Sequence, residues 1–404
     1  MPPNDADAAA AAASDDDDDD DDDDGVARHH GPHVHIVLAS EPEAKFTEEP
    51  LVKRPPLWAW GALALAVAAC SSGGVWFALM GDSPGIMRAS WRLQFTFLLL
   101  LPGFVLDWRE SDTVLRARWR GSLGKMAVAG LSLAVHFAAW SLSLNYTSLA
   151  DSLLFVTTTP ILLVAWQTGV FFAVRLFCHA RTKDFEPPTA LEVCGVLVGF
   201  GAATMLALGD TAHADSDTVQ PSAGGDALAL LGAAAIAVYL NIGAALRQFL
   251  PVWMYACPVT LFAAVFCGLL SLCVEQTDVT GNGPRSFFGD FDADRVGLVV
   301  ASAATAGILG HTLVNLSIKY ISPLIVAIML LLEPVVGSMF GYFAGVQDAP
   351  SAVVYCAGLP LMLSAALVIS GARGQPLHRR LCSRALSPKS PVVVSADATP
   401  TQQV

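Results

Sequence analysis

The sequence predicts an all-α membrane protein of ten transmembrane helices, arranged as two inverted five-helix repeats. Three observations predict this fold: an apolar composition, ten apolar segments of membrane-spanning length, and a weak similarity between the two halves of the chain. Of the 404 residues, 54% are hydrophobic and only 15% are charged, and the mean hydropathy is +0.52. Because a soluble domain carries about 25% charged residues, we expect much of this chain to face lipid.

Ten apolar segments are long enough to cross a bilayer. A helix needs about 20 apolar residues to cross the hydrocarbon core, which is roughly 30 Å thick. The sequence predicts such helices at residues 57–80, 84–106, 122–144, 149–174, 189–208, 226–248, 252–274, 296–318, 323–345 and 350–371. Several are rich in Gly and Ala, a composition that suits close packing of helices in lipid.

Basic residues predict the orientation, because cytosolic segments of membrane proteins are enriched in Lys and Arg. If the N-terminus is cytosolic and the helices alternate in direction, most of the 23 basic residues fall on the cytosolic side. The outer loops contain only Arg285 and Arg295 and are otherwise acidic. We therefore expect an integral multi-pass protein with both termini cytosolic, in the plasma membrane or an endomembrane.

These boundaries divide the chain into five regions. The run Asp15–Asp24 holds ten like charges that repel one another, so the N-terminal tail is expected to be disordered. The regions are an acidic cytosolic tail at 1–56, a first five-helix repeat at 57–208, an outer linker at 209–225, a second five-helix repeat at 226–371, and a basic Ser- and Pro-containing cytosolic tail at 372–404.

A weak internal repeat joins helices two to five to the helices five places later. Offsets of 167 and 163 residues align the second helix with the seventh and the fifth with the tenth. Because five is odd, the second half enters the membrane from the opposite face, as in many secondary transporters with a site near the midplane. An offset of 174 residues aligns Leu142, Ser143, Tyr146, Ser148 and Pro160 with Leu316, Ser317, Tyr320, Ser322 and Pro334 without a gap.

Two passages in this repeat resemble the drug/metabolite transporter superfamily, specifically its EamA-type members. Leu144-Asn145-Tyr146-Thr147-Ser148 leads to Thr159-Pro160, and Ile318-Lys319-Tyr320-Ile321-Ser322 leads to Leu332-Glu333-Pro334. Both are similar to the family's passage from the end of one helix into the next. Glu186, before Gly195, resembles the acidic residue that introduces the last helix of a half; in the second half Asp348 stands one position early.

The resemblance covers residues 57–371. It implies a solute transporter in which helices one to four and six to nine line a central cavity, with helices five and ten peripheral. It does not indicate the solute, since the superfamily carries amino acids, nucleotide sugars, sugar phosphates, drugs and other metabolites.

Ionisable residues within the apolar helices are candidates for function, because charge is costly at membrane depth. Glu333 lies about 15 Å into the ninth helix at 1.5 Å per residue, close to the midplane. It could carry a coupling proton, meet a cationic group, or tie helices together near Pro334. Arg92, about 12 Å from the outer end of the second helix, could hold a carboxylate or phosphate, snorkel to the interface with Arg88, or pair with Glu333.

Other polar residues share helix faces, because side chains four residues apart lie on one side of a helix. They could recognise a ring or hydroxyls in a cavity, or only form hydrogen bonds between helices. Thr157, Thr158 and Thr159 are expected to satisfy carbonyls that Pro160 leaves free. The predicted substrate-binding residues are Arg92, His136, Trp140, Tyr239, Asn241, His311, Asn315 and Glu333.

The sequence favours no enzyme, cofactor, metal or nucleic-acid function. It contains no HExxH, GxSxG or P-loop motif, and its eight cysteines form no CxxC pair. His29–His35 and the Asp run lack the preformed geometry that tight metal binding needs. The expected partners are a small-molecule solute, the lipid bilayer and a coupling proton, and a homodimer stays open.

The predicted function is secondary transport of a small polar organic metabolite by alternating access, coupled to protons or working by exchange. The alternative is a non-transporting membrane scaffold or receptor-like protein that acts through its cytosolic tails. The sequence indicates neither the solute nor the coupling ion.

Overall fold

The computed structural model describes residues 55–81, 83–177, 187–211, 222–281, 285–287, 293–346 and 348–372. These residues are helical, with turns and one isolated bridge between Asp278 and Ser286. Ten helical segments among them are long and apolar enough to cross a membrane, which confirms the predicted number. The interpretations of the acidic run, the His-rich segment, Glu186 and the basic tail concern parts of the chain that lie outside the described residues.

The ten segments, called spans one to ten here, include several that are built from stacked helices. Spans one to five are α1 (Leu57–Ser71) with α2 (Gly73–Leu79), α3 (Gly85–Glu110), α5 (Leu123–Tyr146), α6 (Leu149–Val156) with α7 (Thr159–Phe177), and α8 (Ala190–Thr211). Spans six to ten are α9 (Ala223–Leu246), α10 (Val252–Leu270) with the π-helix η2 (Ser271–Glu275), α11 (Ala293–Ser302) with the π-helix η3 (Ala303–Thr312) and α12 (Leu313–Ser317), α13 (Pro323–Leu330) with α14 (Glu333–Phe343), and α15 (Ala352–Ala372). A further helix, α4 (Thr113–Gly121), connects spans two and three.

Span six begins three residues earlier than the predicted start at 226. The reason is a cap: Ser222 Oγ accepts a hydrogen bond from the backbone N–H of Gly225 at 3.1 Å. Such a side chain satisfies one of the N–H groups that the first helical turn leaves without a partner.

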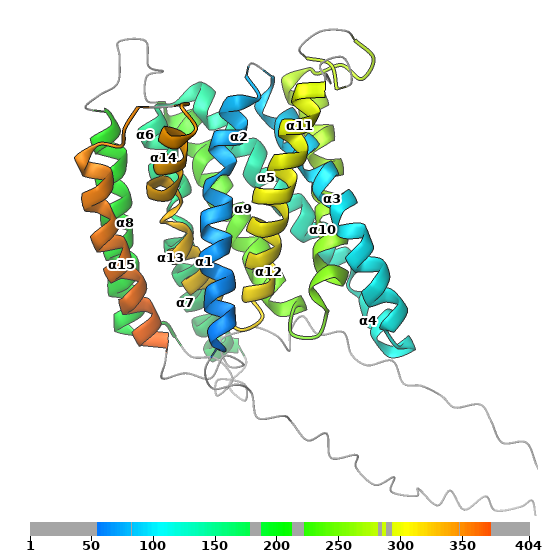
Figure 1. Cartoon of the computed structure of the whole chain (residues 1–404). Coiled ribbons are helices and arrows are strands. Elements are labelled where there is room, and N and C mark those ends of the chain that lie inside the picture. Colours follow the sequence, from blue (N-terminus) through cyan, green and yellow to red (C-terminus); the bar gives the residue numbers. More distant parts are fainter. Residues whose placement is uncertain are drawn as a thin grey trace, which may run out of the picture. The chain divides into compact units, whose positions relative to one another are not determined.

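Spans four and nine are interrupted in the same way and run in opposite directions. Span four descends from α6 to α7, whereas span nine rises from α13 to α14 (Figure 1). Ser148 and Ser322 cap α6 and α13, both helices have eight residues, and their bounds differ by 174 positions. The helix that follows each break carries a proline, Pro160 or Pro334, in its first turn, where a missing N–H costs nothing.

The interruption in span four leaves carbonyl groups that threonines satisfy. Thr157, Thr158 and Thr159 each donate a hydroxyl hydrogen bond to the carbonyl three residues earlier, at 2.8, 2.6 and 3.1 Å. The acceptor for Thr159 is Val156, whose carbonyl would receive the N–H that Pro160 lacks. The expected role is confirmed for Thr159, whereas Thr157 and Thr158 donate to the carbonyls of Leu154 and Phe155, which Pro160 does not free.

Span eight contains the π-helix η3 where the sequence pattern predicted regular α-helix. Its glycines press against neighbouring spans. A Cβ atom on Gly307 would lie 2.1 Å from Thr96 Oγ1, and one on Gly310 would lie 2.8 Å from Cys70 Sγ. This close approach to spans one and two depends on tertiary packing, which cannot be predicted from the spacing of apolar residues in the sequence.

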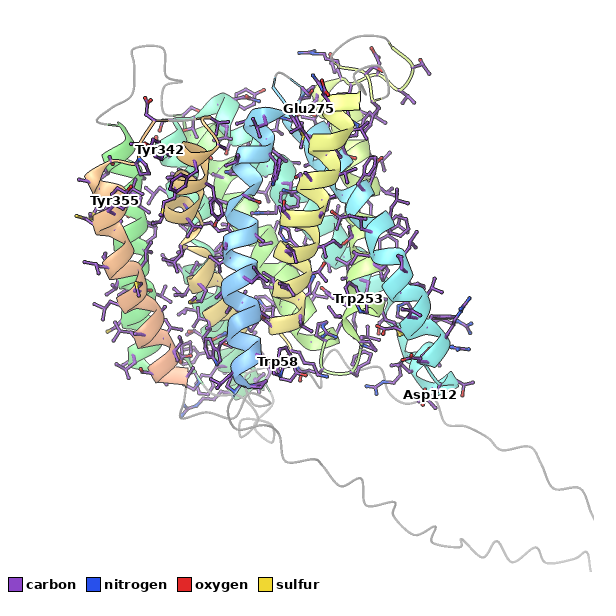
Figure 2. All side chains as sticks on the ribbon, viewed as in Figure 1. Trp58, Asp112, Trp253, Glu275, Tyr342 and Tyr355 are labelled. Carbon is purple, nitrogen blue, oxygen red and sulfur yellow. The ribbon has the colours of Figure 1, made fainter. Side chains whose placement is uncertain are left out.

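The outer surface of the bundle is apolar. Leu57, Phe177 and Phe343 are 88%, 79% and 77% exposed, which would be costly in water. Trp58 and Trp253 lie toward the lower end, and Tyr342 and Tyr355 toward the upper end (Figure 2). Aromatic residues at both ends and aliphatic residues between them are typical of membrane proteins. The described chain is therefore an integral, multi-pass membrane protein.

Spans five and ten pack closely because Gly195 of α8 leaves room for α15 (left side of Figure 1). A Cβ atom on Gly195 would lie 2.6 Å from Val368 Cγ2 and 2.9 Å from the Ser364 carbonyl oxygen. Ser364 Oγ donates to the Gly195 carbonyl at 2.6 Å. Close backbone approach of this kind supplies van der Waals packing, which replaces the hydrophobic effect between helices in lipid.

We expect Gly195→Ala to destabilise the protein by about 1–3 kcal/mol, because the added methyl group overlaps backbone atoms of α15. Thermal unfolding of the purified protein in detergent measures the change. Gly201→Ala is the matched control on the same helix, where a Cβ atom meets nothing within 4 Å. Equal melting temperatures for the two variants would contradict the proposed packing.

Candidate binding cavity

A cavity of about 480 Å³ lies between seven of the ten spans. Its lining comes from spans one, two, three, four, six, eight and nine. Spans five and ten contribute no lining residue within the described chain, and neither does span seven, which the family resemblance had placed around the cavity. Instead, α10 of span seven packs outside the cavity, against α3 and α5.

The cavity brings together six of the eight predicted residues: Arg92, His136, Trp140, Tyr239, His311 and Glu333. The other two do not line it. Asn315 is buried behind Tyr239 and accepts its hydroxyl hydrogen bond at 3.0 Å. Asn241 donates to the Ala237 carbonyl of its own helix at 2.9 Å.

Arg92 is only 5% exposed, so it does not snorkel to the interface. Its guanidinium carbon lies 4.4 Å from the ring centre of Phe137 and 5.2 Å from that of Phe77. Arg88, one turn earlier, instead donates to the backbone carbonyls of Phe77 and Gly81 at 2.5 and 3.1 Å. Arg92 is thus held by two aromatic faces, an arrangement that stabilises a cation electrostatically.

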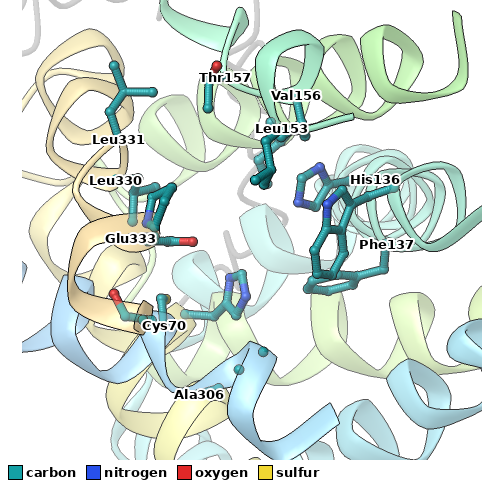
Figure 3. Close-up of a pocket in the computed structure, with 18 of the residues that line it drawn as sticks. Cys70, His136, Phe137, Leu153, Val156, Thr157, Ala306, Leu330, Leu331 and Glu333 are labelled. Carbon is teal, nitrogen blue, oxygen red and sulfur yellow. The ribbon is translucent and has the colours of Figure 1, made fainter. Parts of the chain in front are cut away.

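Glu333 begins α14, directly after the break in span nine. Its carboxylate points into the cavity, opposite the wall that carries His136 and Phe137 (Figure 3). The structure shows no ion pair or hydrogen bond between Glu333 and Arg92 within the described chain, so the suggested Arg92–Glu333 pair is absent. The cavity therefore contains one acidic and one basic side chain that are not joined to each other.

Two histidines line the cavity near Phe137. His136 Nδ1 lies 3.0 Å from the Gly232 carbonyl oxygen. Because that oxygen can only accept, Nδ1 carries the hydrogen, and in the neutral ring Nε2 is left as an acceptor. His311 belongs to the π-helix η3, and its ring meets that of Phe137 edge to face at 5.5 Å. Single π-helical segments are frequent at functional sites.

A buried polar layer links spans six and eight beside the cavity. It consists of Tyr239, Asn315 and Arg247, which are all at least 95% buried. Arg247 Nε donates to the Asn315 carbonyl at 2.8 Å, and another nitrogen of Arg247 donates to the Leu250 carbonyl. Burial lowers the pKa of Arg247 to about 10, so the guanidinium stays charged at neutral pH. The layer joins the lower ends of spans six and eight.

Phe77 and Phe137, the two residues that flank Arg92, are not among the predicted site residues. Phenylalanine in an apolar helix carries no signal of its own. One signal was available for Phe137, because the 174-residue offset aligns it with His311, and the two rings are in contact.

The arrangement suits binding of a small organic molecule rather than metal chemistry. In the described part of the chain, no group of three or more His, Cys, Asp or Glu side chains is placed to hold a metal ion. The volume lies within the range of small-molecule sites, and a largely apolar wall with a few polar groups is typical of them.

Comparison with known proteins supports the fold alone. No protein-family model and no curated protein sequence matches the chain. A protein of solved crystal structure is similar with a TM-score of 0.57 and 16% sequence identity, over 79% of this chain and 98% of that one. The ten-span architecture therefore has a counterpart among solved structures.

We expect Tyr239→Phe to lower the stability of the protein by about 1–2 kcal/mol, because Asn315 Oδ1 loses its donor in a buried layer. Thermal unfolding in detergent measures this loss. Tyr342→Phe, at a tyrosine that is 48% exposed, is the control and should change stability by less than about 0.5 kcal/mol. If both variants melt alike, the layer does not stabilise the packing of spans six and eight.

Proposed function

We propose that the protein is a secondary transporter that moves a small polar organic metabolite across a membrane by alternating access, and that it is an EamA-type member of the drug/metabolite transporter superfamily. The observation that carries the proposal is a cavity between the spans that contains Arg92 and Glu333. Two of these spans, four and nine, are interrupted at matching positions and run in opposite directions. Solute movement is coupled to protons or to exchange.

Contacts between spans support an inverted repeat. If span one corresponds to span six, span two to seven, and so on, each contact should have a counterpart. The packing of α5 on α9 (spans three and six) has its counterpart in the packing of α1 on η3 and α12 (spans one and eight). In the pairs α3–α10 (spans two and seven) and α8–α15 (spans five and ten), each helix packs against its own equivalent. Phe137 and His311, which the 174-residue offset aligns, touch each other, as equivalent residues near a two-fold axis do.

The cavity and the polar layer support alternating access. The cavity lining includes α2, α6 and α14, which lie at the upper end in Figure 1. Toward the lower end, Tyr239, Asn315 and Arg247 hold spans six and eight together. Two halves of one ancestry that exchange conformations would open the lower end and close the upper one.

Basic residues support a cytosolic lower end. Arg118 and Arg120 lie on α4, and Lys319 lies between α12 and α13; both regions are at the lower end in Figure 1. Glu275 lies at the upper end (Figure 2). By the positive-inside rule, both termini are cytosolic and the cavity extends toward the outside.

We expect Glu333→Gln to abolish stimulation of solute uptake by a proton gradient, because glutamine cannot bind and release the proton that the carboxylate carries. Uptake into liposomes containing the purified protein, with and without an inward proton gradient, measures this effect over a metabolite panel.

Glu110→Gln, at an exposed position that ends α3, is the control for loss of one carboxylate and should behave as the parent protein. Gradient-stimulated uptake that survives Glu333→Gln would remove Glu333 from the coupling mechanism. Absence of any uptake or exchange over the panel would favour the alternative, a scaffold acting through its tails.

We also expect epitope tags at the two ends of the chain to be accessible from the cytosol only, and a tag inserted between α8 and α9 from the opposite side only. Antibody binding before and after selective permeabilisation of expressing cells measures the topology. Tags at the two ends that appear on opposite sides would contradict an even number of spans and the inverted repeat with it.

A further inference from the structure

The Arg92 guanidinium lacks a hydrogen-bond partner that a buried cation needs. Its Nη2 atom is buried without any hydrogen bond, and the side chain is 5% exposed. The rings of Phe77 and Phe137 attract the positive charge but offer no oxygen acceptor to the N–H groups. A buried donor without an acceptor is costly, and the described part of the chain supplies no acceptor for this nitrogen.

No carboxylate among the residues that the structure describes fills this role. Glu333 is the one acidic residue among the described lining residues, and it forms no ion pair with Arg92. Its carboxylate points into the open space of the cavity instead (Figure 3). The acceptor for Arg92 must therefore come from a molecule that occupies the cavity.

We propose that the solute of this transporter carries a single carboxylate, which binds Arg92, on a small and largely apolar body. The proposal rests on the proposed function and specifies its solute class. A planar carboxylate matches the fork of N–H donors on a guanidinium.

The charge of the cavity favours a carboxylate over a phosphate ester. Arg92 is the one Lys or Arg among the lining residues that the structure describes. A phosphate monoester carries a charge of about −1.5 to −2 at neutral pH, which exceeds the single positive charge of Arg92, whereas a carboxylate matches it. The body of the solute would lie against Phe77, Phe137 and Trp140, which favours a flat or aliphatic group.

Gly73 keeps space free beside the guanidinium. A Cβ atom at this position would lie 3.5 Å from Arg92 Nη1 and 3.9 Å from Ala306 Cβ. These are ordinary contact distances, so an alanine fits without strain. Its methyl group would nevertheless occupy space next to the donors that the carboxylate needs. Gly73→Ala therefore tests access to Arg92 without removing its charge.

The experiment measures binding to the purified full-length protein in detergent, without a gradient, from the shift in melting temperature. The probes are acetate, benzoate, 3-phenylpropionate and indole-3-acetate, each paired with its neutral amide, and 2-phenylethyl phosphate. We expect one or more of the larger acids to stabilise the protein, their amides to have no effect, and the phosphate to bind more weakly than 3-phenylpropionate.

Arg92→Gln should weaken binding of the effective acid by about tenfold or more, because a charged hydrogen-bond donor is lost. Arg92→Lys should retain part of the binding, and Gly73→Ala should weaken it severalfold. Arg116→Gln and Gly61→Ala are controls outside the cavity and should bind as the parent protein does. If Arg92→Gln does not fold, as judged by gel filtration, Gly73→Ala decides the question.

Three results would overturn the proposal: no acid stabilises the parent protein, the amides stabilise it as well as the acids do, or the response to acids survives Arg92→Gln. Tighter binding of the phosphate would reject the carboxylate. Acid binding that depends on Arg92 without flux in liposomes would reject transport and leave this site standing. Flux of neutral solutes without acid binding would reject the carboxylate site and leave the proposed transport standing.

Discussion

The structure depends on one constraint: within lipid, each backbone N–H and C=O group needs a partner in the chain itself. Continuous helices meet this need in most spans. Where spans four and nine are interrupted, Ser148 and Ser322 cap the new helices, and threonines take up free carbonyls in span four. The interruption in span nine also places Glu333 at the start of a helix that faces the cavity. The proposed coupling group thus lies where the helix is broken.

The two halves share the elements that build the frame and differ in the residues that give the cavity its chemistry. Serine caps and prolines recur 174 residues apart. At the same offset Thr159 stands where Glu333 does, and Phe137 stands where His311 does. On our proposal, a duplicated frame allows two conformations of similar energy, and unequal side chains let a single asymmetric solute bind. The charged groups can therefore diverge without loss of the fold.

Arg92 shows how the bundle tolerates a permanent charge at membrane depth. Phe77 and Phe137 cover it with aromatic faces that stabilise the cation without neutralising it. A protein carboxylate at this place would make a stable ion pair and would leave nothing for a ligand to gain. An aromatic cradle keeps the donors available, and on our proposal that availability is the source of affinity for an anionic group.

The sequence by itself determined the ten spans and most of the polar cavity residues, because apolar length and charge in lipid are local properties of the chain. Only the tertiary structure decided that Asn315 supports Tyr239 from behind, that Arg92 and Glu333 stay apart, and that span seven lies outside the cavity. These features depend on which helix faces meet and how closely. The closeness of the helices depends on glycines such as Gly307 and Gly310, which contact segments distant in the sequence.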